Sequence, residues 1–238
     1  MPFLLQTVMV NNTKLSFLKF TLVWILPLKY DTIPIGKLQR RPTMPTEVYF
    51  VRHAQPDMTI HDDALRPLSL KGLSDAKLVT RFLKDKSIDL VYLSPYKRSV
   101  DTIRDFSQVM NLPITCIQDF RERTVNDIWI EDFMEFVRKQ WKDFNYKMSA
   151  GESLQEVQDR NISALEEIIT LHSGKKIVIG THGTALSTII NYYDNSFHLD
   201  QFLQYINLMP WLVKITFDGS ICIKIEHFNL FEVYAISC

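Results

Sequence analysis

The chain has 238 residues, of which 46% are hydrophobic and 23% charged, and its 27 basic and 27 acidic side chains cancel. This apolar content supports a substantial core and excludes a chain that is disordered throughout. Residues 1–43 carry six basic side chains and one acidic one, so residues 44–238 carry 21 basic and 26 acidic ones. An acidic body of this kind excludes general binding to nucleic acid, which needs many cations for the phosphate backbone.

The first 43 residues differ from the rest. Their apolar run at 15–28 contains Lys19 and is about 14 residues long, whereas a spanning helix needs about 20. The charges and small residues of a secretory signal are also missing, so we expect no stable membrane insertion. The favoured interpretation is an upstream extension, with Met44 as the natural start and 44–238 as the domain. A peripheral anchor or targeting segment and a structural arm remain alternatives.

Short apolar runs alternate with longer stretches of helical spacing from Glu47 onward. The runs predict buried strands at 47–52, 89–93 and 176–181, a weaker strand at 114–117, and a closing hairpin of 211–217 with 221–227. The longer stretches predict helices at 70–84, 96–110 and 153–171. Ser153 and Glu156 form a capping-box pattern at the start of the last helix. This alternation predicts a mostly parallel sheet covered on both faces, an α/β fold.

An aromatic segment at 129–144 also has helical spacing. We expect an amphipathic helix that packs one face on the domain. The alternative is a lid over the ligand site that favours a substrate with an apolar part.

Three widely spaced cysteines, Cys116, Cys222 and Cys238, form no C-x-x-C pattern. Their odd number and spacing predict neither a disulfide framework nor a zinc cluster, and favour a reducing compartment, the cytoplasm. The histidines form no H-x-x-x-H or H-E-x-x-H motif, so the sequence predicts no metal site.

Reactive side chains follow three of the predicted strands. Arg52 and His53 end the first, Arg98 lies shortly after the second, and His182 and Gly183 follow the 176–181 strand. Ligands of open α/β sheets bind beyond the carboxyl ends of the strands, so we expect these residues to meet. Guanidinium groups match phosphate oxygens, a neutral imidazole can attack phosphorus, and a glycine N–H at a helix start can bind an oxyanion. The set therefore predicts a site for a phosphoryl group.

Two common nucleotide-binding motifs are absent from the sequence. There is no G-x-x-x-x-G-K-[ST] loop and no G-x-G-x-x-G fingerprint. Binding of a nucleotide by either of these loops is therefore not expected.

Four motifs together resemble the histidine phosphatase superfamily, also called the phosphoglycerate mutase-like family. They are VYFVRHAQPD from residue 48, LSPYKRSVDT from 93, FRE from 120 and GTHGTAL from 180. The resemblance runs from about residue 47 to about 231, and it implies a three-layer α/β/α sandwich.

The resemblance implies a role for each matching residue. His53 is the expected nucleophile that becomes phosphohistidine, and Arg52 and Arg98 are expected to hold the phosphoryl oxygens. His182 is expected to stabilise the transition state and Glu122 to act as general acid and then as general base. Gly183 and His182 complete the expected phosphate site, and no metal or cofactor is implied.

Two positions depart from the family pattern. Ala54 replaces the usual glycine, and we expect it to tighten the phosphate pocket slightly. Residues 123–127 replace a glycine-rich stretch after Glu122, which leaves Asp119, Asp127 and Glu131 as alternative acids. Glu122 could instead form only a surface salt bridge with its neighbour Arg121 or Arg123.

The other histidines lack a partner pattern, and Ser94 is expected to shape a turn and at most to support the site from behind. We interpret as structural or solvated His61, His172, His198 and His227.

The sequence thus predicts a cytoplasmic, metal-independent phosphomonoester hydrolase that acts on a small phosphorylated substrate. A cofactor-dependent phosphoglycerate mutase is the nearest alternative, although the body of about 195 residues offers little room for the longer insertions of such enzymes. The second alternative is a module that binds phosphorylated ligands without turnover.

Overall fold

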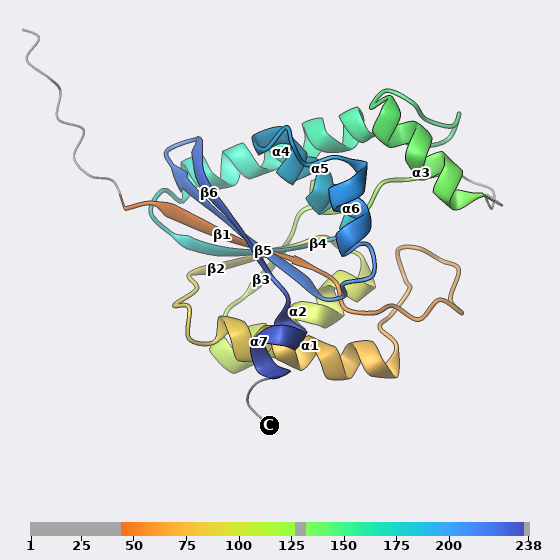
Figure 1. The fold of residues 1–238 in the computed structure, drawn as a ribbon. Coiled ribbons are helices and arrows are strands. Elements are labelled where there is room, and N and C mark those ends of the chain that lie inside the picture. The colour runs from red at the N-terminus through yellow and green to blue at the C-terminus, as the bar shows by residue number, and fades with distance from the viewer. Residues whose placement is uncertain (1–43, 127–131, 236–238) are drawn as a thin grey trace, which may run out of the picture. The chain divides into compact units, whose positions relative to one another are not determined.

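The computed structural model describes residues 44–126 and 132–235, which lie within one compact unit (Figure 1). Six strands in this part of the chain form one sheet in the order β3-β2-β4-β1-β5-β6. The strands are β1 (Thr46–Arg52), β2 (Leu90–Leu93), β3 (Ile114–Cys116), β4 (Lys176–Thr181), β5 (Trp211–Asp218) and β6 (Ile221–Phe228). All six expected strands are therefore found, each within one residue of its predicted ends.

The sheet is mostly parallel, as predicted. Strands β3, β2, β4 and β1 run in the same direction, whereas β5 is antiparallel to β1 and β6 is antiparallel to β5. The β5–β6 hairpin closes through Gly219, whose φ of 61° is readily available to glycine. The central strands β1 and β4 pair from Glu47 with Lys176 to Arg52 with Thr181, so their carboxyl ends lie side by side.

Helices cover both faces of the sheet and give the three layers that the resemblance implied (Figure 1). Those on one face are α3 (Phe133–Lys142), α4 (Leu154–Leu171), α5 (Gly183–Tyr193) and α6 (Leu199–Tyr205), and those on the other are α1 (Leu70–Leu83), α2 (Lys97–Met110) and α7 (Leu230–Ala235). A short 3₁₀ helix, η1 (Gln118–Phe120), precedes the predicted acid Glu122.

Alternation along β1 divides the core between these layers. Val48 and Phe50 pack toward α4 and α5, whereas Tyr49 and Val51 pack toward α1 and α2. The strand is buried on both faces, which explains why it reads as a nearly continuous apolar run rather than an alternating one.

Helix α4 confirms the predicted capping box. The Ser153 hydroxyl accepts a hydrogen bond from the Glu156 N–H, and the Glu156 carboxylate accepts one from the Ser153 N–H. The aromatic segment forms α3 from Phe133 to Lys142, with Phe136 and Trp141 buried, while its start at 129–131 lies outside the described residues. Helices α6 and α7 carried no strong sequence signal because both are short.

None of the helices in the described part of the chain is long and apolar enough to cross a membrane. Cys116 and Cys222 are both free thiols. Cys238 lies outside the described residues.

Candidate active site

Two neighbouring parallel strands deliver the first groups of the site. Arg52 ends β1 and Thr181 ends β4, and the N–H of His53 donates to the carbonyl of Thr181 over 3.1 Å. This pairing places His53 and His182 on adjacent chain segments, and the two ring centroids are 5.2 Å apart. The expectation that distant strand ends bring the two histidines together is met by the geometry.

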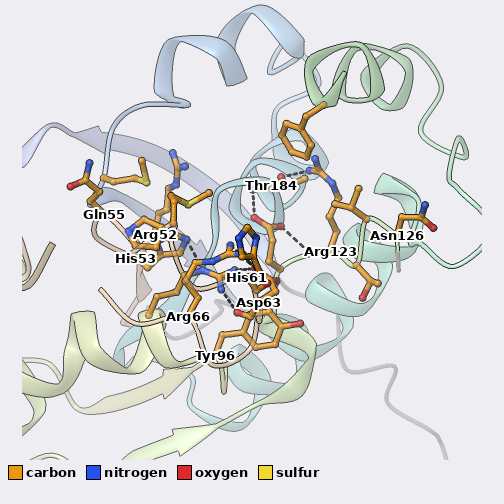
Figure 2. Close-up of a pocket in the computed structure, with 18 residues that line it drawn as sticks. Arg52, His53, Gln55, His61, Asp63, Arg66, Tyr96, Arg123, Asn126 and Thr184 are labelled. Carbon is orange, nitrogen blue, oxygen red and sulfur yellow. Dashed lines mark hydrogen bonds and ion pairs between the residues drawn. The ribbon is translucent and has the colours of Figure 1, made fainter. Parts of the chain in front are cut away.

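A pocket of about 940 Å³ opens at these strand ends (Figure 2). The charged side chains in its wall are Arg52, Asp63, Arg66, Arg98, Glu122 and Arg123. The four arginines outnumber the two carboxylates, so the wall carries an excess of positive charge that favours anions. Of the site residues expected from the sequence, the pocket wall contains Arg52, His53, Arg98 and Glu122.

The His53 ring is held in one tautomer by two hydrogen bonds. Nδ1 lies 2.8 Å from the carbonyl oxygen of Ala54, which can only accept, so Nδ1 carries the proton. Nε2 lies 3.1 Å from Nε–H of Arg98 and accepts from it. Burial and the positive charges of Arg98 and Arg52 hold the pKa of His53 well below its usual range. His53 is therefore a neutral imidazole whose unprotonated Nε2 can attack once Arg98 releases its hydrogen bond.

Arg98 is fixed by the loop that follows β1. Its Nη1 donates to the carbonyl of Asp63, and its Nη2 lies 3.2 Å from the Asp63 carboxylate. The same carboxylate pairs with Arg66 at 3.1 Å. Arg98 is only 3% exposed, so this anion offsets much of the cost of burying its charge.

Arg52 is fixed by backbone carbonyls instead. Its Nη1 lies 2.9 Å from the carbonyls of Tyr205 and Ile206 and 3.3 Å from that of Leu208, at the carboxyl end of α6. Helix carboxyl ends attract cations because their last carbonyls lack partners in the helix. Burial, assisted by the charge of Arg98, lowers the pKa of Arg52 to about 10, so the group stays protonated at neutral pH.

Gly183 leaves room for the close approach of Arg52. A Cβ at Gly183 would lie 3.0 Å from Cζ and Nε of Arg52, so the guanidinium would have to move by a few tenths of an ångström to make room. From the sequence, we expected glycine here so that its backbone N–H could approach an oxyanion. The structure shows in addition that the missing side chain leaves space for the Arg52 guanidinium. Gly183 itself is not part of the pocket wall.

His182 lies behind the pocket rather than in its wall. Its ring has no exposed surface and packs edge-on against His53 and Tyr96. Nε2 lies 2.7 Å from the Ser94 hydroxyl, while Nδ1 has no hydrogen-bond partner among the described residues. Burial and the charge of Arg98 hold the pKa of His182 well below its usual range. If the Ser94 hydroxyl donates to Nε2, the proton of this neutral ring lies on Nδ1.

Glu122 caps the start of α5. Its carboxylate oxygens accept backbone N–H groups from Arg123 at 2.9 Å, Thr184 at 3.1 Å and Ala185 at 3.3 Å. The expected alternative, a salt bridge to a neighbouring arginine, is not found among the described residues, because Arg121 pairs with Glu152 instead. Glu122 thus faces the pocket with its carboxylate held by the amino end of a helix.

A partly buried ion-pair network fixes the loop that carries Glu122. Arg160 in α4 donates to the carbonyls of Asp119, Arg121 and Glu122, and its Nε lies 2.9 Å from Glu152. Glu152 also accepts from Arg121 at 2.6 Å and from the N–H of Thr124 at 2.9 Å. Sequence reasoning missed this network.

Electrostatics agree with the geometry of this network. Burial alone would raise the pKa of Glu152, but the hydrogen bonds from Arg160 and Thr124 and the nearby arginine charges outweigh it and lower the pKa. Glu152 is therefore ionised near neutral pH.

Two expectations about neighbouring residues need correction. Ala54 packs in a small cluster with Leu68 and Ala76 and lies outside the pocket wall, so it does not tighten the phosphate pocket. Asp119 is exposed on η1 and does not face the pocket, which removes it as an alternative acid. Asp127 and Glu131 lie outside the described residues.

Several pocket residues were not found by sequence reasoning. His61 was taken as structural or solvated, but it lies in the pocket wall together with Asp63, Arg66 and Tyr96 (Figure 2). They belong to the loop after β1 and to the turn before α2, which have no periodic pattern. Residues 61–66 lie within the range of the family resemblance, but none of its four motifs covers them. In contrast, His172 bonds to the Tyr92 hydroxyl away from the pocket.

Comparisons with known proteins identify the family. The model of the histidine phosphatase superfamily, branch 1, matches residues 48–220. The chain therefore belongs to the histidine phosphatase superfamily. This membership confirms the resemblance read from the motifs and the predicted class of enzyme, a phosphatase of the histidine phosphatase type.

Individual relatives are distant. The uncharacterized phosphatase PhoE of Bacillus subtilis is 29% identical over 150 residues, which are 61% of this chain and 76% of the relative. The metal-independent phosphoserine phosphatase of Arabidopsis thaliana is 27% identical over 159 residues, 60% of this chain and 67% of the relative. A solved phosphoserine phosphatase mutant from Entamoeba histolytica, in complex with phosphoserine, has a TM-score of 0.64 at 17% identity and covers 77% of this chain and 96% of its own. That structure confirms the fold.

We predict that Gly183→Ala weakens the binding of inorganic phosphate about tenfold, because the new methyl group pushes the Arg52 guanidinium by a few tenths of an ångström relative to its three carbonyls. Calorimetric titration with phosphate measures the effect. In an Arg52→Ala background the same substitution should have little further effect, since its target is gone. Equal losses in both backgrounds would show that Gly183 acts by another route.

We predict that Glu152→Gln lowers the free energy of unfolding by about 2 kcal/mol at pH 7, the scale of hydrogen bonds to a charged group. The lowered pKa of Glu152 means that its ionised form stabilises the fold above the ordinary carboxyl pKa. That contribution is lost as pH falls through the lowered value, so the difference should vanish in acid. Urea unfolding at pH 7 and pH 3 measures it. Glu166→Gln on the exposed side of α4 is the control, and an equal effect there would contradict the prediction.

Proposed function

We propose that residues 44–238 form a metal-independent phosphomonoester hydrolase that works through a phosphohistidine at His53. The observation that carries this proposal is the neutral His53 ring, which lies in the pocket wall with its unprotonated Nε2 on Arg98 and with Arg52 in the same wall. Membership of the histidine phosphatase superfamily supports the same chemistry. The substrate is a small phosphorylated molecule, a class to which phosphoserine belongs.

In the first step, Nε2 of His53 attacks phosphorus while the bond to the leaving oxygen breaks. Arg98 must first release its hydrogen bond to Nε2, and the freed N–H can then bind a phosphoryl oxygen. Arg52 and Arg98 supply positive charge where negative charge spreads over the phosphoryl oxygens. Glu122 delivers a proton to the leaving oxygen, so the alcohol departs neutral.

In the second step, Glu122 takes a proton from water as the water oxygen attacks phosphorus and the N–P bond breaks. The products are inorganic phosphate and neutral His53, and Glu122 regains the proton that it gave up. The N–H groups of Arg123, Thr184 and Ala185 stabilise the carboxylate form of Glu122, which the first step produces and the second step uses. The neutral His182 ring, whose centroid lies 5.2 Å from that of His53, is the second imidazole of the proposed site.

We predict that His53→Ala removes turnover of p-nitrophenyl phosphate and the acid-labile phosphoenzyme. The reason is that no other group in the pocket wall is a neutral ring nitrogen that accepts a hydrogen bond from Arg98. Rapid quench with ³²P-labelled substrate detects the intermediate. His172→Ala removes a histidine outside the pocket and should keep both signals. Label on the wild-type protein at any residue other than His53 would overturn the mechanism.

Assays with 3-phosphoglycerate separate the proposed hydrolase from the two alternatives. A hydrolase releases inorganic phosphate from it. Isomerisation that depends on 2,3-bisphosphoglycerate and releases no phosphate would indicate a mutase. Saturable binding with no turnover of any phosphomonoester would indicate a binding module.

We predict that Glu122→Gln slows hydrolysis of glycerol 1-phosphate about 10²- to 10⁴-fold and that of p-nitrophenyl phosphate much less. The nitrophenolate departs without a proton, whereas an alkoxide needs one. The ratio of the two kcat/KM values measures the effect without interference from general misfolding. Equal losses on both substrates would assign the proton transfer to another carboxylate.

A further inference from the structure

Ser94 and His182 form a buried hydrogen-bonded pair behind the pocket. Ser94 follows β2 and His182 follows β4, and these neighbouring parallel strands pair up to Leu93 and Gly180. The N–H of Ser94 donates to the carbonyl of Gly180 over 2.8 Å, which continues the pairing past the end of β2. Both side chains are fully buried, and the Ser94 hydroxyl lies 2.7 Å from Nε2 of His182. The backbone of the sheet therefore helps to fix the hydroxyl against the ring.

The other contact of the Ser94 hydroxyl indicates the direction of this hydrogen bond. Its oxygen lies 3.3 Å from the backbone N–H of Tyr96, which can only donate. Among the described residues, Nε2 of His182 is the only group within hydrogen-bond distance that can accept the hydroxyl hydrogen. A buried hydroxyl that leaves its hydrogen unpaired costs free energy. The Ser94 hydroxyl therefore donates to Nε2.

The opposite nitrogen of His182 has no bond that would reverse this assignment. Nδ1 is buried and has no hydrogen-bond partner among the described residues. A side chain just before a helix often accepts N–H groups of the first turn. Here the N–H groups of Thr184 and Ala185 are taken by the Glu122 carboxylate instead. A neutral imidazole that accepts a hydrogen bond at Nε2 carries its proton on Nδ1.

We propose that Ser94 is a positioning residue that holds the proton of His182 on Nδ1, so that this histidine takes part in the reaction as a hydrogen-bond donor and not as a base or a second nucleophile. The inference rests on the hydrolase proposed above, in which negative charge spreads over the phosphoryl oxygens at His53. The His182 ring lies edge-on to His53 at a centroid distance of 5.2 Å. The phosphoryl oxygens are the acceptors that the reaction brings to this part of the site. With Nε2 bound by Ser94, the second ring offers no free lone pair to phosphorus.

The tautomer can be read directly in the whole chain labelled with ¹⁵N. Long-range ¹H–¹⁵N correlation spectra show which ring nitrogen carries the proton, and His182→Gln assigns the signals of His182 by their loss. We expect Nδ1–H in the wild-type protein and a mixture of both tautomers in Ser94→Ala. A wild-type ring protonated on Nε2, or an unchanged tautomer in Ser94→Ala, would overturn the proposal. The spectra need no turnover, so they decide the tautomer even if the protein releases no phosphate and the hydrolase fails.

Kinetics measure what the tautomer contributes to the reaction. Ser94→Ala should lower kcat for p-nitrophenyl phosphate roughly tenfold, the scale of one hydrogen bond, with little change in KM, because the donor acts on charge that grows in the transition state. Ser94→Thr keeps the hydroxyl and should recover most of kcat. Ser99→Ala removes a buried hydroxyl that has no partner among the described residues, and it should leave kcat unchanged. An unchanged kcat in Ser94→Ala protein with mixed tautomers would refute the role in the reaction.

A double variant separates the tautomer from other effects of Ser94. In a His182→Gln background there is no tautomer to select, so adding Ser94→Ala should have little further effect on the residual kcat. The same loss in both backgrounds would show that Ser94 acts through the shape of the turn before α2. If the wild-type protein hydrolyses phosphomonoesters, that result removes the role of Ser94 and leaves the hydrolase intact.

Discussion

The hydrogen bond from Nε of Arg98 to Nε2 of His53 is the interaction on which the rest of the site depends. It can form only if Nε2 is unprotonated, and the bond from Nδ1 to the Ala54 carbonyl requires the opposite nitrogen to carry the proton. The two bonds therefore select one tautomer of a neutral ring. Burial and the nearby guanidinium charges disfavour the imidazolium form and keep the ring in that state. The same cations that could bind a phosphoryl group thus also prepare the nucleophile.

Burying so many cations in one place is costly, and each is stabilised differently. Arg98 has the carboxylate of Asp63, whereas Arg52 has the carbonyls at the end of α6. That helix end is itself anchored to the sheet, since Tyr205 stacks on Trp211 of β5 at a centroid distance of 4.5 Å. The position of the Arg52 guanidinium therefore depends on the stack of Tyr205 on Trp211. Arg123 has only a hydroxyl and two aromatic faces among the described residues, which sets it apart from the other two.

The sequence predicted the sheet, the main helices and the residues at the strand ends because these follow from local periodicity and from the strand order of α/β folds. His53 and Arg98 could be placed together before any coordinates, since the carboxyl ends of parallel strands share one edge. The loop after β1 could not be placed, because its path depends on tertiary contacts such as the bond from Arg98 to Asp63. The close approach of Arg52 to Gly183 was equally hidden, because it brings together residues that follow two separate strands.

The two sides of the pocket, one with Arg52 and His53 and the other with Glu122 and Arg123, are held in place by different parts of the fold. His53 and Arg52 come from the end of a central strand, where parallel pairing on one side and antiparallel pairing on the other leave little freedom. Glu122 and Arg123 lie on a loop whose path is set by Arg160 and Glu152, side chains of a peripheral helix and of the turn before it. A substitution in that loop can change what the leaving group contacts without disturbing β1. The groups proposed to bind the phosphoryl group thus lie at strand ends, whereas the loop with Glu122 and Arg123 is held by Arg160 and Glu152 and by one hydrogen bond from Thr181 of β4 to the carbonyl of Phe120.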